Sequence, residues 1–141
     1  MMVEEQDYEQ VLMEYSQNVL EHFLNPRNVG RIEAPDAAAK VGDPGCGDYI
    51  ELFLRMEGNK IAEIKYLVFG CAGAISTSSA LTELAKGKSV AEALEITDDD
   101  VIDYLGGIPE RKKHCSLLGV KALHSAIKAY QQKMKFVQKT S

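Results

Sequence analysis

The 141-residue chain lacks the features that mark several large classes of protein. It has no apolar run that approaches the length of a membrane span, and its acidic start (Glu4, Glu5 and Asp7) has the wrong charge for a signal or transit peptide. Its formal net charge is −5 and it has no long block of Lys and Arg, which argues against a nonspecific nucleic-acid binder. We therefore expect a cytoplasmic protein that binds neither membrane nor nucleic acid.

Length and composition favour one folded domain. A chain of this length can bury one core but is too short for two ordinary domains. Hydrophobic residues make up 45% and charged residues 26%, as is typical of globular proteins, and there is no internal repeat or low-complexity segment. We predict a single domain over residues 1–141, with an ordered core from about residue 8 to residue 134.

The hydrophobic pattern predicts an α+β fold. Apolar residues recur at three- and four-residue spacings from Tyr8 to Phe23, which predicts an N-terminal helix that ends before Pro26. The next stretch is rich in proline and predicts a loop with at most a short strand. From residue 49 to residue 69 the apolar residues alternate with period two on either side of Gly58 and Asn59, which predicts an antiparallel hairpin. The second strand is expected to place these residues on one face: Ala62, Ile64, Tyr66 and Val68.

Helices are predicted for the second half of the chain. The helical stretch after Cys71 is expected to end at Gly87, and a long amphipathic helix is expected to begin near Cys115 and to fray after Met134. Two short helices between them each open with a capping box, Ser89 with Glu92 and Thr97 with Asp100. The predicted fold is a small antiparallel sheet of about three strands with helices packed on one face.

Three cysteines, Cys46, Cys71 and Cys115, are candidates for a functional site. An odd number in a chain with no sign of secretion argues against a disulfide framework, and none of the spacings is the CxxC of zinc fingers or rubredoxins. Each cysteine lies where one predicted element ends or the next begins. The alternative for each is a small buried hydrophobic residue.

Cys46 lies in the stretch GDPGCGDY, between Gly45 and Gly47. The two glycines remove neighbouring Cβ atoms and let a bulky group approach the backbone, which favours a reactive or metal-binding thiol over a buried structural one. Asp48 lies two residues further on, and the period of a strand would place it on the same side as Cys46. The alternative for Asp48 is a carboxylate that caps a turn.

Cys71 and Cys115 each lie at the start of a predicted helix, in FGCAGAIS and ERKKHCSLLG. Backbone N–H groups at a helix N-terminus favour anions and lower the pKa of a thiol. A small residue packed under the helix start explains Cys71 equally well. Cys115 follows His114 and the lysines Lys112 and Lys113, whose charge favours a nucleophilic thiolate, although the lysines alone could be solvated surface.

Together the three cysteines, Asp48 and His114 give five candidate donors. Thiolates select zinc, copper(I) or iron–sulfur clusters, and the mixture with a carboxylate and an imidazole leaves zinc and iron–sulfur clusters as the leading choices. The other two histidines are expected to lie outside the site. His22 belongs to the N-terminal helix, and His124 is expected to be solvated on a helix face that it shares with two lysines.

Four segments resemble, in the same order, those of the iron–sulfur cluster assembly scaffolds of the IscU type, which are similar to the N-terminal domain of NifU. The segments are YSQNVLEHFLNPRNVG, GDPGCGD, FGCAGAISTSS and HCSLLGVKALHSAI. The resemblance implies a scaffold, not an enzyme, on which a 2Fe–2S cluster is assembled from iron and sulfur and then passed to apo-proteins. Its ligands would be the three cysteines, with Asp48 or His114 as the fourth. Cys115 would accept incoming sulfur as a persulfide, and the same ligands can bind zinc in the cluster-free protein.

The resemblance also implies partners. These are a cysteine desulfurase that supplies sulfur, recipient apo iron–sulfur proteins, and a ferredoxin or frataxin-like protein, with a homo-oligomer in the cluster-bound state. Many bacterial members carry a Pro-Pro-Val-Lys stretch before the His-Cys pair that a dedicated Hsp70-type chaperone recognises. This chain reads IPERKKHC, so use of that chaperone is not carried over. The further domains of full-length NifU have no counterpart, and we expect a stand-alone scaffold.

A second interpretation is a SufU-like zinc-dependent sulfurtransferase that accepts sulfur from a cysteine desulfurase. Members of that branch carry a long insertion between their second and third cysteines. Here the stretch from Cys71 to Cys115 is filled by the predicted helices with no extra segment, so this interpretation ranks second. A third is a plain zinc-stabilised interaction domain, which chelation would unfold.

Overall fold

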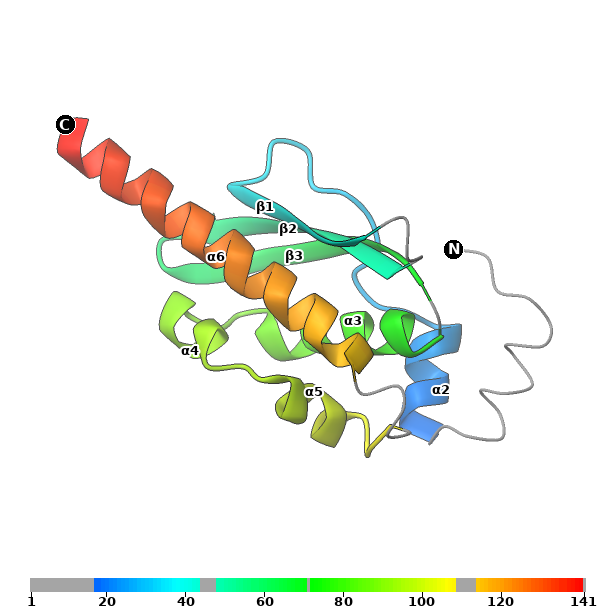
Figure 1. The fold of residues 1–141 in the computed structure, drawn as a ribbon. Helices are drawn as coiled ribbons and strands as arrows, with labels where there is room; N and C mark the ends of the chain where they lie inside the picture. Colours follow the sequence, from blue (N-terminus) through cyan, green and yellow to red (C-terminus); the bar gives the residue numbers. More distant parts are fainter. Residues whose placement is uncertain (1–16, 44–47, 71, 109–113, 141) are drawn as a thin grey trace.

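The computed structural model describes residues 17–43, 48–70, 72–108 and 114–140. At the ends of some of these stretches it describes the backbone but not the side chains. The described elements are α2 (Gln17–Leu24), β1 (Ala37–Asp43), β2 (Asp48–Glu57), β3 (Lys60–Phe69), α3 (Ala72–Ala85), α4 (Val90–Leu94), α5 (Asp98–Tyr104) and α6 (His114–Thr140). They form the predicted α+β fold around a three-stranded antiparallel sheet in the order β1-β2-β3 (Figure 1). The described part of the predicted N-terminal helix, α2, is helical and ends before Pro26, as predicted.

The predicted hairpin of β2 and β3 is confirmed, with one shift in register. The strands pair antiparallel on either side of the turn at Gly58, and the register shifts between Arg55 and Met56. On the turn side of this irregularity Ile61, 1% exposed, faces the core, whereas Ala62 is exposed. The prediction that Ala62 lies on the inner face was therefore wrong, because a bulge inserts a residue into one strand and moves the side chains beyond it to the other face.

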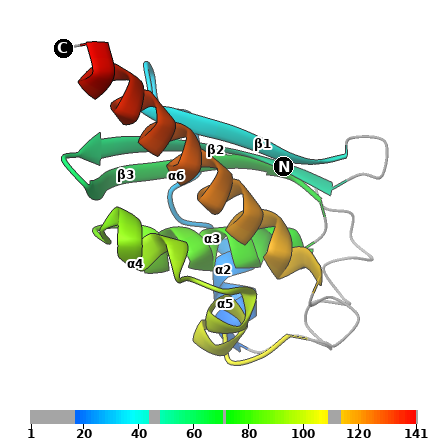
Figure 2. The same cartoon turned by 60° about the vertical axis from the view of Figure 1, so that its left-hand side comes forward.

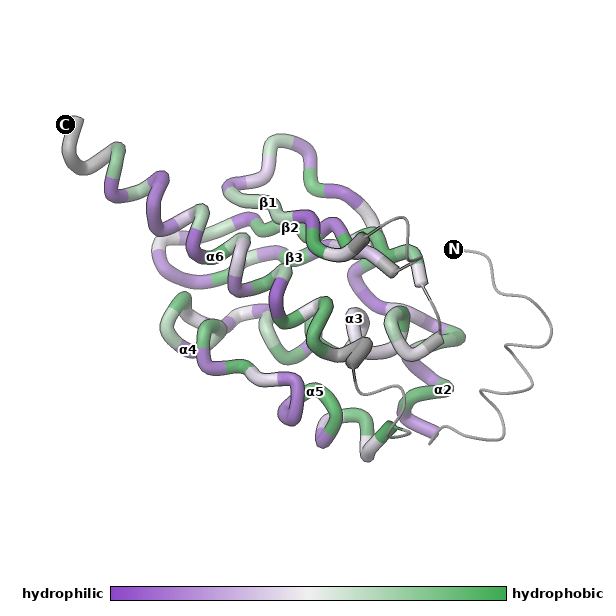
Figure 3. The backbone as a smooth tube through the Cα atoms, in the orientation of Figure 1, coloured by the Kyte–Doolittle hydropathy of each residue, from purple (hydrophilic) through white to green (hydrophobic). Residues whose placement is uncertain are grey.

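The described helices lie on one side of the sheet (Figures 1 and 2). α6 packs across β1 and β2, and α3 lies against β3. The strand residues that face the helices are almost completely buried: Ile50, Leu52, Leu54, Ile64, Tyr66 and Val68. Hydrophilic and hydrophobic residues alternate along α6, as expected of a helix with one face on a sheet and the other in solvent (Figure 3). Among the helices described, none is both long and apolar enough to cross a membrane.

Helix α3 is buried over most of its length although it is rich in hydroxyl groups. Every residue from Gly73 to Thr82 is buried. Its buried hydroxyl residues are Ser76, Thr77, Ser78, Ser79 and Thr82. Thr77 donates a hydrogen bond to the carbonyl oxygen of Gly73 at 2.8 Å, and Ser76 donates one to that of Val19 in α2 at 3.0 Å. Small side chains let neighbouring helices approach closely, and these hydrogen bonds offset the cost of burying polar groups.

Gly119 sets the distance between α6 and α3. A Cβ atom at this position would lie 2.9 Å from Leu81 Cδ2, so a larger residue would force the buried Leu81 side chain of α3 to move, and it would be in van der Waals contact with Ser78 Oγ at 3.9 Å. The backbone of α6 therefore lies against α3 about one helical turn after Cys115. Glycine lowers helix stability at an internal position, and the close contact between the helices offsets this cost.

Both predicted capping boxes are present, Ser89 with Glu92 at the start of α4 and Thr97 with Asp100 at the start of α5. α6 is helical as far as Thr140, six residues beyond Met134, after which fraying was predicted. The sequence after Gly119 contains no further Gly or Pro in this helix, and its Gln, Lys and Met residues are good helix formers, so nothing in the local sequence ends the helix earlier.

Replacing Gly119 with valine should lower the free energy of unfolding by about 2–3 kcal/mol, because the branched side chain would overlap Leu81 and Ser78 and force the two helices apart. Chemical denaturation followed by circular dichroism measures this loss. Ala129→Val, at an exposed position of the same helix, is the matched control and should cost only the lower helix propensity of valine, about 0.5 kcal/mol. Equal losses in the two variants would show that Gly119 does not set the helix contact.

Candidate functional site

The chain segments that carry the predicted donors meet at one end of the sheet. β1 ends at Asp43, which pairs with Asp48, the first residue of β2, and β3 ends at Phe69 opposite Tyr49. α3 begins shortly after β3, at Ala72. In both ribbon views the first turns of α3 and α6 lie at this same end (Figures 1 and 2). The fold therefore brings together elements that are far apart in the sequence.

The structure describes the backbone of three of the five predicted donors and leaves the other two outside the described residues. Cys46 and Cys71 lie outside the described residues. Asp48 is the first residue of β2, His114 the first of α6 and Cys115 the second, but the side chains of these three lie outside the described set. The arrangement of the five donors around a metal thus stays a prediction. Within the part of the chain that is described, no group of three or more His, Cys, Asp or Glu residues could hold a metal ion.

Two helix N-termini lie at this end. α3 begins one residue after Cys71, and α6 begins at His114 with Cys115 as its second residue. Neither helix has an acidic residue in its first turn. The N–H groups of a first turn carry partial positive charge, which stabilises thiolates and bound anionic groups. The backbone at this end therefore favours anionic sulfur.

A pair of aromatic residues, half-buried Tyr49 and exposed Phe69, lies beside this end, on the face of the sheet opposite to the helices. The rings of Tyr49 and Phe69 stack across β2 and β3, with centroids 4.8 Å apart and planes 14° apart. Phe69 is 51% exposed, and the Lys40 ammonium nitrogen lies 5.6 Å from the centroid of the Tyr49 ring. Sequence reasoning missed this pair. The period-two pattern puts both residues on the outer face, but only the strand register shows that they are neighbours.

His22 connects α2 to α3. Its Nδ1 lies 2.7 Å from the Ser79 hydroxyl oxygen, and its Nε2 lies 3.2 Å from the Glu83 carboxylate. The Tyr104 hydroxyl of α5 donates a hydrogen bond to the same carboxylate at 3.1 Å. Three helices are therefore joined by one polar network, which could not be read from the sequence around His22 alone.

Burial lowers the pKa of His22 below its ordinary value. This effect outweighs the Glu83 carboxylate, which raises the pKa but is itself one-third exposed. Arg27 lowers the pKa further, and Glu21 raises it. The neutral imidazole satisfies both contacts, because Nε2–H can donate to Glu83 while Nδ1 accepts from the Ser79 hydroxyl.

His124 is half-buried, where we expected it to be solvated. Its Nε2 is buried and has no hydrogen-bond partner among the described residues. Lys121 and Lys128 are exposed as expected, but His124 also adjoins the buried side of α6 formed by Leu123 and Ile127. It therefore lies at the boundary between the apolar and the charged face of the helix.

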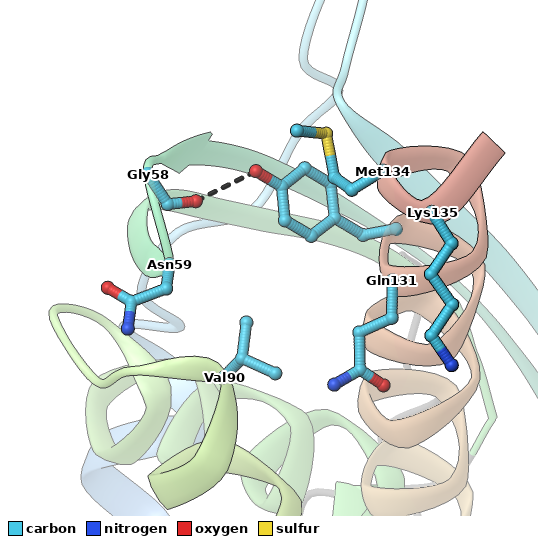
Figure 4. Close-up of a pocket in the computed structure, with 7 residues that line it drawn as sticks. Gly58, Asn59, Val90, Gln131, Met134 and Lys135 are labelled. Atoms are coloured by element: carbon cyan, nitrogen blue, oxygen red, sulfur yellow. Dashed lines mark hydrogen bonds between the residues drawn. The ribbon is translucent and has the colours of Figure 1, made fainter. Parts of the chain in front are cut away.

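A groove of about 430 Å³ lies at the opposite end of the sheet, between the β2–β3 turn, the start of α4 and the second half of α6 (Figure 4). Its lining residues are Gly58, Asn59, Val90, Tyr130, Gln131, Met134 and Lys135. The Tyr130 hydroxyl donates a hydrogen bond to the Gly58 carbonyl oxygen at 2.7 Å and joins α6 to the turn. None of the lining residues is Cys, His, Asp or Glu, so this groove is not suited to bind iron or zinc.

Acidification should destabilise the protein through His22. The unfolded state takes up a proton at His22 near pH 6.5, whereas the folded state does so only at lower pH, so the contribution of neutral His22 is lost as the pH falls below 6.5. The free energy of unfolding, measured by urea denaturation, should therefore fall between about pH 7 and pH 5.5 and should fall less steeply in His22→Gln. An identical pH slope in that variant would exclude His22 as the group responsible.

Comparison with known proteins identifies the family of the chain. The sequence model of the NifU-like N-terminal domain matches residues 14–137. The chain is 51% identical over 119 residues to the iron–sulfur cluster assembly scaffold protein IscU 1 of Archaeoglobus fulgidus. The aligned residues cover 84% of this chain and 78% of that protein. It is 43% identical over 130 residues to the iron–sulfur cluster assembly scaffold protein IscU of Aquifex aeolicus, and these residues cover 91% of this chain and 83% of that protein.

A solved structure shows the same fold. The crystal structure of a nitrogen-fixing NifU-like protein (N-terminal) from Brucella abortus matches with a TM-score of 0.71, over 84% of this chain and 94% of that one. Because the two sequences are only 20% identical, this match concerns the fold alone. The family match and the identities confirm the resemblance described above, and the chain belongs to the family of NifU-like N-terminal domains, which includes the IscU-type scaffolds.

Proposed function

We propose that the protein is a scaffold on which a 2Fe–2S cluster is assembled from iron and from sulfur supplied by a cysteine desulfurase, and from which the cluster passes to apo-proteins. The observation that carries this proposal is the 51% identity, over 84% of the chain, to a protein named as an iron–sulfur cluster assembly scaffold. The fold supports it, because the elements next to the five candidate donors meet at one end of the sheet.

Cys46, Cys71 and Cys115 are the proposed thiolate ligands, with Asp48 or His114 as the fourth. Thiolates are the usual ligands of iron in such clusters, whereas a carboxylate or an imidazole is a harder ligand that exchanges more readily. A scaffold must hold its cargo during assembly and release it afterwards. One exchangeable ligand among three thiolates meets both requirements, and the same set can bind zinc in the cluster-free protein.

Cys115 is the proposed acceptor of sulfur. Its thiolate attacks the terminal sulfur of a persulfide on the desulfurase, the S–S bond of that persulfide breaks, and the desulfurase cysteine leaves as a thiolate. The position of Cys115 in the first turn of α6, directly after His114, favours the thiolate form. Each sulfur must then gain two electrons to become sulfide, and a ferredoxin-like partner is the proposed electron donor.

The aromatic pair of Tyr49 and Phe69 is the proposed contact surface for proteins that deliver sulfur or receive the cluster. Both residues lie at the end of the sheet where the donors are expected, and Phe69 is 51% exposed. Exposed aromatic side chains beside a binding site are typical of protein contact surfaces. A partner seated on this pair would have the predicted donors within its reach.

Anaerobic incubation with ferrous iron, cysteine and a cysteine desulfurase should produce a visible iron–sulfur chromophore with the Mössbauer signal of a 2Fe–2S centre. Mass spectrometry before iron is added should find the persulfide on Cys115, and Cys115→Ser, the control, should carry none there. A protein that forms no chromophore, retains zinc tightly and accelerates the desulfurase only in its zinc form would instead be a sulfurtransferase, and the scaffold proposal would be rejected.

Asp48→Ala should slow transfer of the cluster to an apo-protein by about tenfold, because the exchangeable carboxylate is lost, while the free energy of unfolding changes by less than about 0.5 kcal/mol. Asp43→Ala is the matched control, since Asp43 pairs with Asp48 across β1 and β2 and its loss removes the same charge. Transfer from the control should keep the wild-type rate. Wild-type transfer from Asp48→Ala itself would exclude Asp48 as a functional ligand.

A further inference from the structure

The hydroxyl group of Ser78 is buried in the core without a hydrogen-bond partner among the described residues. Ser78 is 1% exposed, and its Oγ makes no hydrogen bond there. The neighbouring hydroxyls of Ser76, Thr77 and Ser79 all make hydrogen bonds. A buried hydroxyl without a partner lowers the stability of the folded state, whereas an alanine in its place would not. A carbonyl oxygen that came within hydrogen-bond distance of Ser78 Oγ in another state of the protein would remove this cost.

Ser78 lies on the side of α3 that faces Gly119 of α6. Its Oγ is 3.9 Å, and its Cα 4.0 Å, from the position that a Cβ atom of Gly119 would occupy. In α-helical geometry the N–H group of Gly119 bonds to the carbonyl oxygen of Cys115, four residues earlier. That oxygen has a second lone pair, which can accept a hydrogen bond from a donor on α3. The space beside Gly119 is shared by Ser78 and by the Leu81 side chain, whose Cδ2 lies 2.9 Å from the same Cβ position.

The direction of the two helices places this hydroxyl toward the candidate site. α3 and α6 both begin at the donor end of the sheet (Figures 1 and 2). Side chains on a helix tilt toward its N-terminus, so the Ser78 hydroxyl leans toward that end. Cys115 lies about 6 Å before Gly119 along the axis of α6. The first turn of α6 therefore lies on the side of Gly119 toward which the Ser78 hydroxyl leans.

We propose that Ser78 is a positioning residue for Cys115. Its hydroxyl donates a hydrogen bond to the main-chain carbonyl oxygen of Cys115 when Cys115 carries the cluster, and it has no partner in the cluster-free protein. The hydrogen bond holds the first turn of α6, and with it the Cβ atom of Cys115, against α3. A bond made only in the loaded state shifts the equilibrium toward that state. This inference rests on the proposed function and adds to it a residue outside the set of metal ligands.

Two serine variants test the inference in the cluster-free protein. Ser78→Ala should raise the melting temperature by about 3 °C, because it removes an unpaired buried hydroxyl. Ser76→Ala is the matched control from the same helix and should lower the melting temperature, because the Ser76 hydroxyl bonds to Val19 of α2. Differential scanning calorimetry of both variants and the wild type provides this comparison without any cluster.

The same variants are then loaded with the cluster and kept well below their melting temperatures. The half-life of the visible chromophore in the presence of an iron chelator should fall about fivefold in Ser78→Ala, the factor expected for one lost hydrogen bond, and stay at the wild-type value in Ser76→Ala. The visible circular dichroism bands of the cluster should change in Ser78→Ala alone, because the first turn of α6 is then less firmly held.

A Ser78→Ala protein with the wild-type half-life and the wild-type circular dichroism bands would overturn the inference and leave the Ser78 hydroxyl as a packing defect. A lower melting temperature of cluster-free Ser78→Ala would also overturn it, because the hydroxyl would then already have a partner in that state. These results require a wild-type protein that loads normally. If the wild type forms no chromophore, the proposed function itself fails, so the two failures are distinguishable.

Discussion

The burial of α3 is the constraint on which the rest of the structure depends. This helix packs against α2, α6 and β3, and every residue from Gly73 to Thr82 is buried. Most side chains in this stretch are small or carry a hydroxyl group and let the neighbouring elements approach closely, while Ile75 and Leu81 fill the core between them. The position of α3 in the core determines where its first residue, Ala72, lies, and Cys71 is bonded directly to that residue. A candidate ligand is thereby attached to a helix that is buried in the core.

The two helices that flank α3 are held by different interactions. α2 is joined to it by two hydrogen bonds: Ser79 donates to Nδ1 of His22, which requires a neutral imidazole, and Ser76 donates to the carbonyl oxygen of Val19. α6 is held by close contact of its backbone at Gly119, which involves no titratable group. A change of pH therefore acts on the packing of α2, whereas a change of side-chain volume acts on the packing of α6. Since α6 carries Cys115 in its first turn, the second contact is the one that positions a predicted ligand.

Local patterns were sufficient to predict the features that depend on local interactions. The capping boxes join residues three apart, and the alternation of β2 and β3 depends on a hairpin with a short turn. The features that were missed depend on distant contacts. Ser79, the partner of His22, is 57 residues away in the sequence, and the bulge that replaces Ala62 by Ile61 in the core depends on how two strands fit one sheet.

The candidate site also has features that local patterns predict and features that depend on distant contacts. The donors were predicted from residue types and flanking glycines, and antiparallel pairing requires the end of β1, the start of β2 and the end of β3 to lie together. The sequence predicted where α6 begins along the chain, but no local pattern could predict where that start lies relative to the sheet, because this position depends on the contact of Gly119 with α3. The described elements that flank the donors are fixed by the core. Under the proposed function this constraint is necessary, because donors carried by separate segments can bind one cluster only if the core holds those segments at the same place.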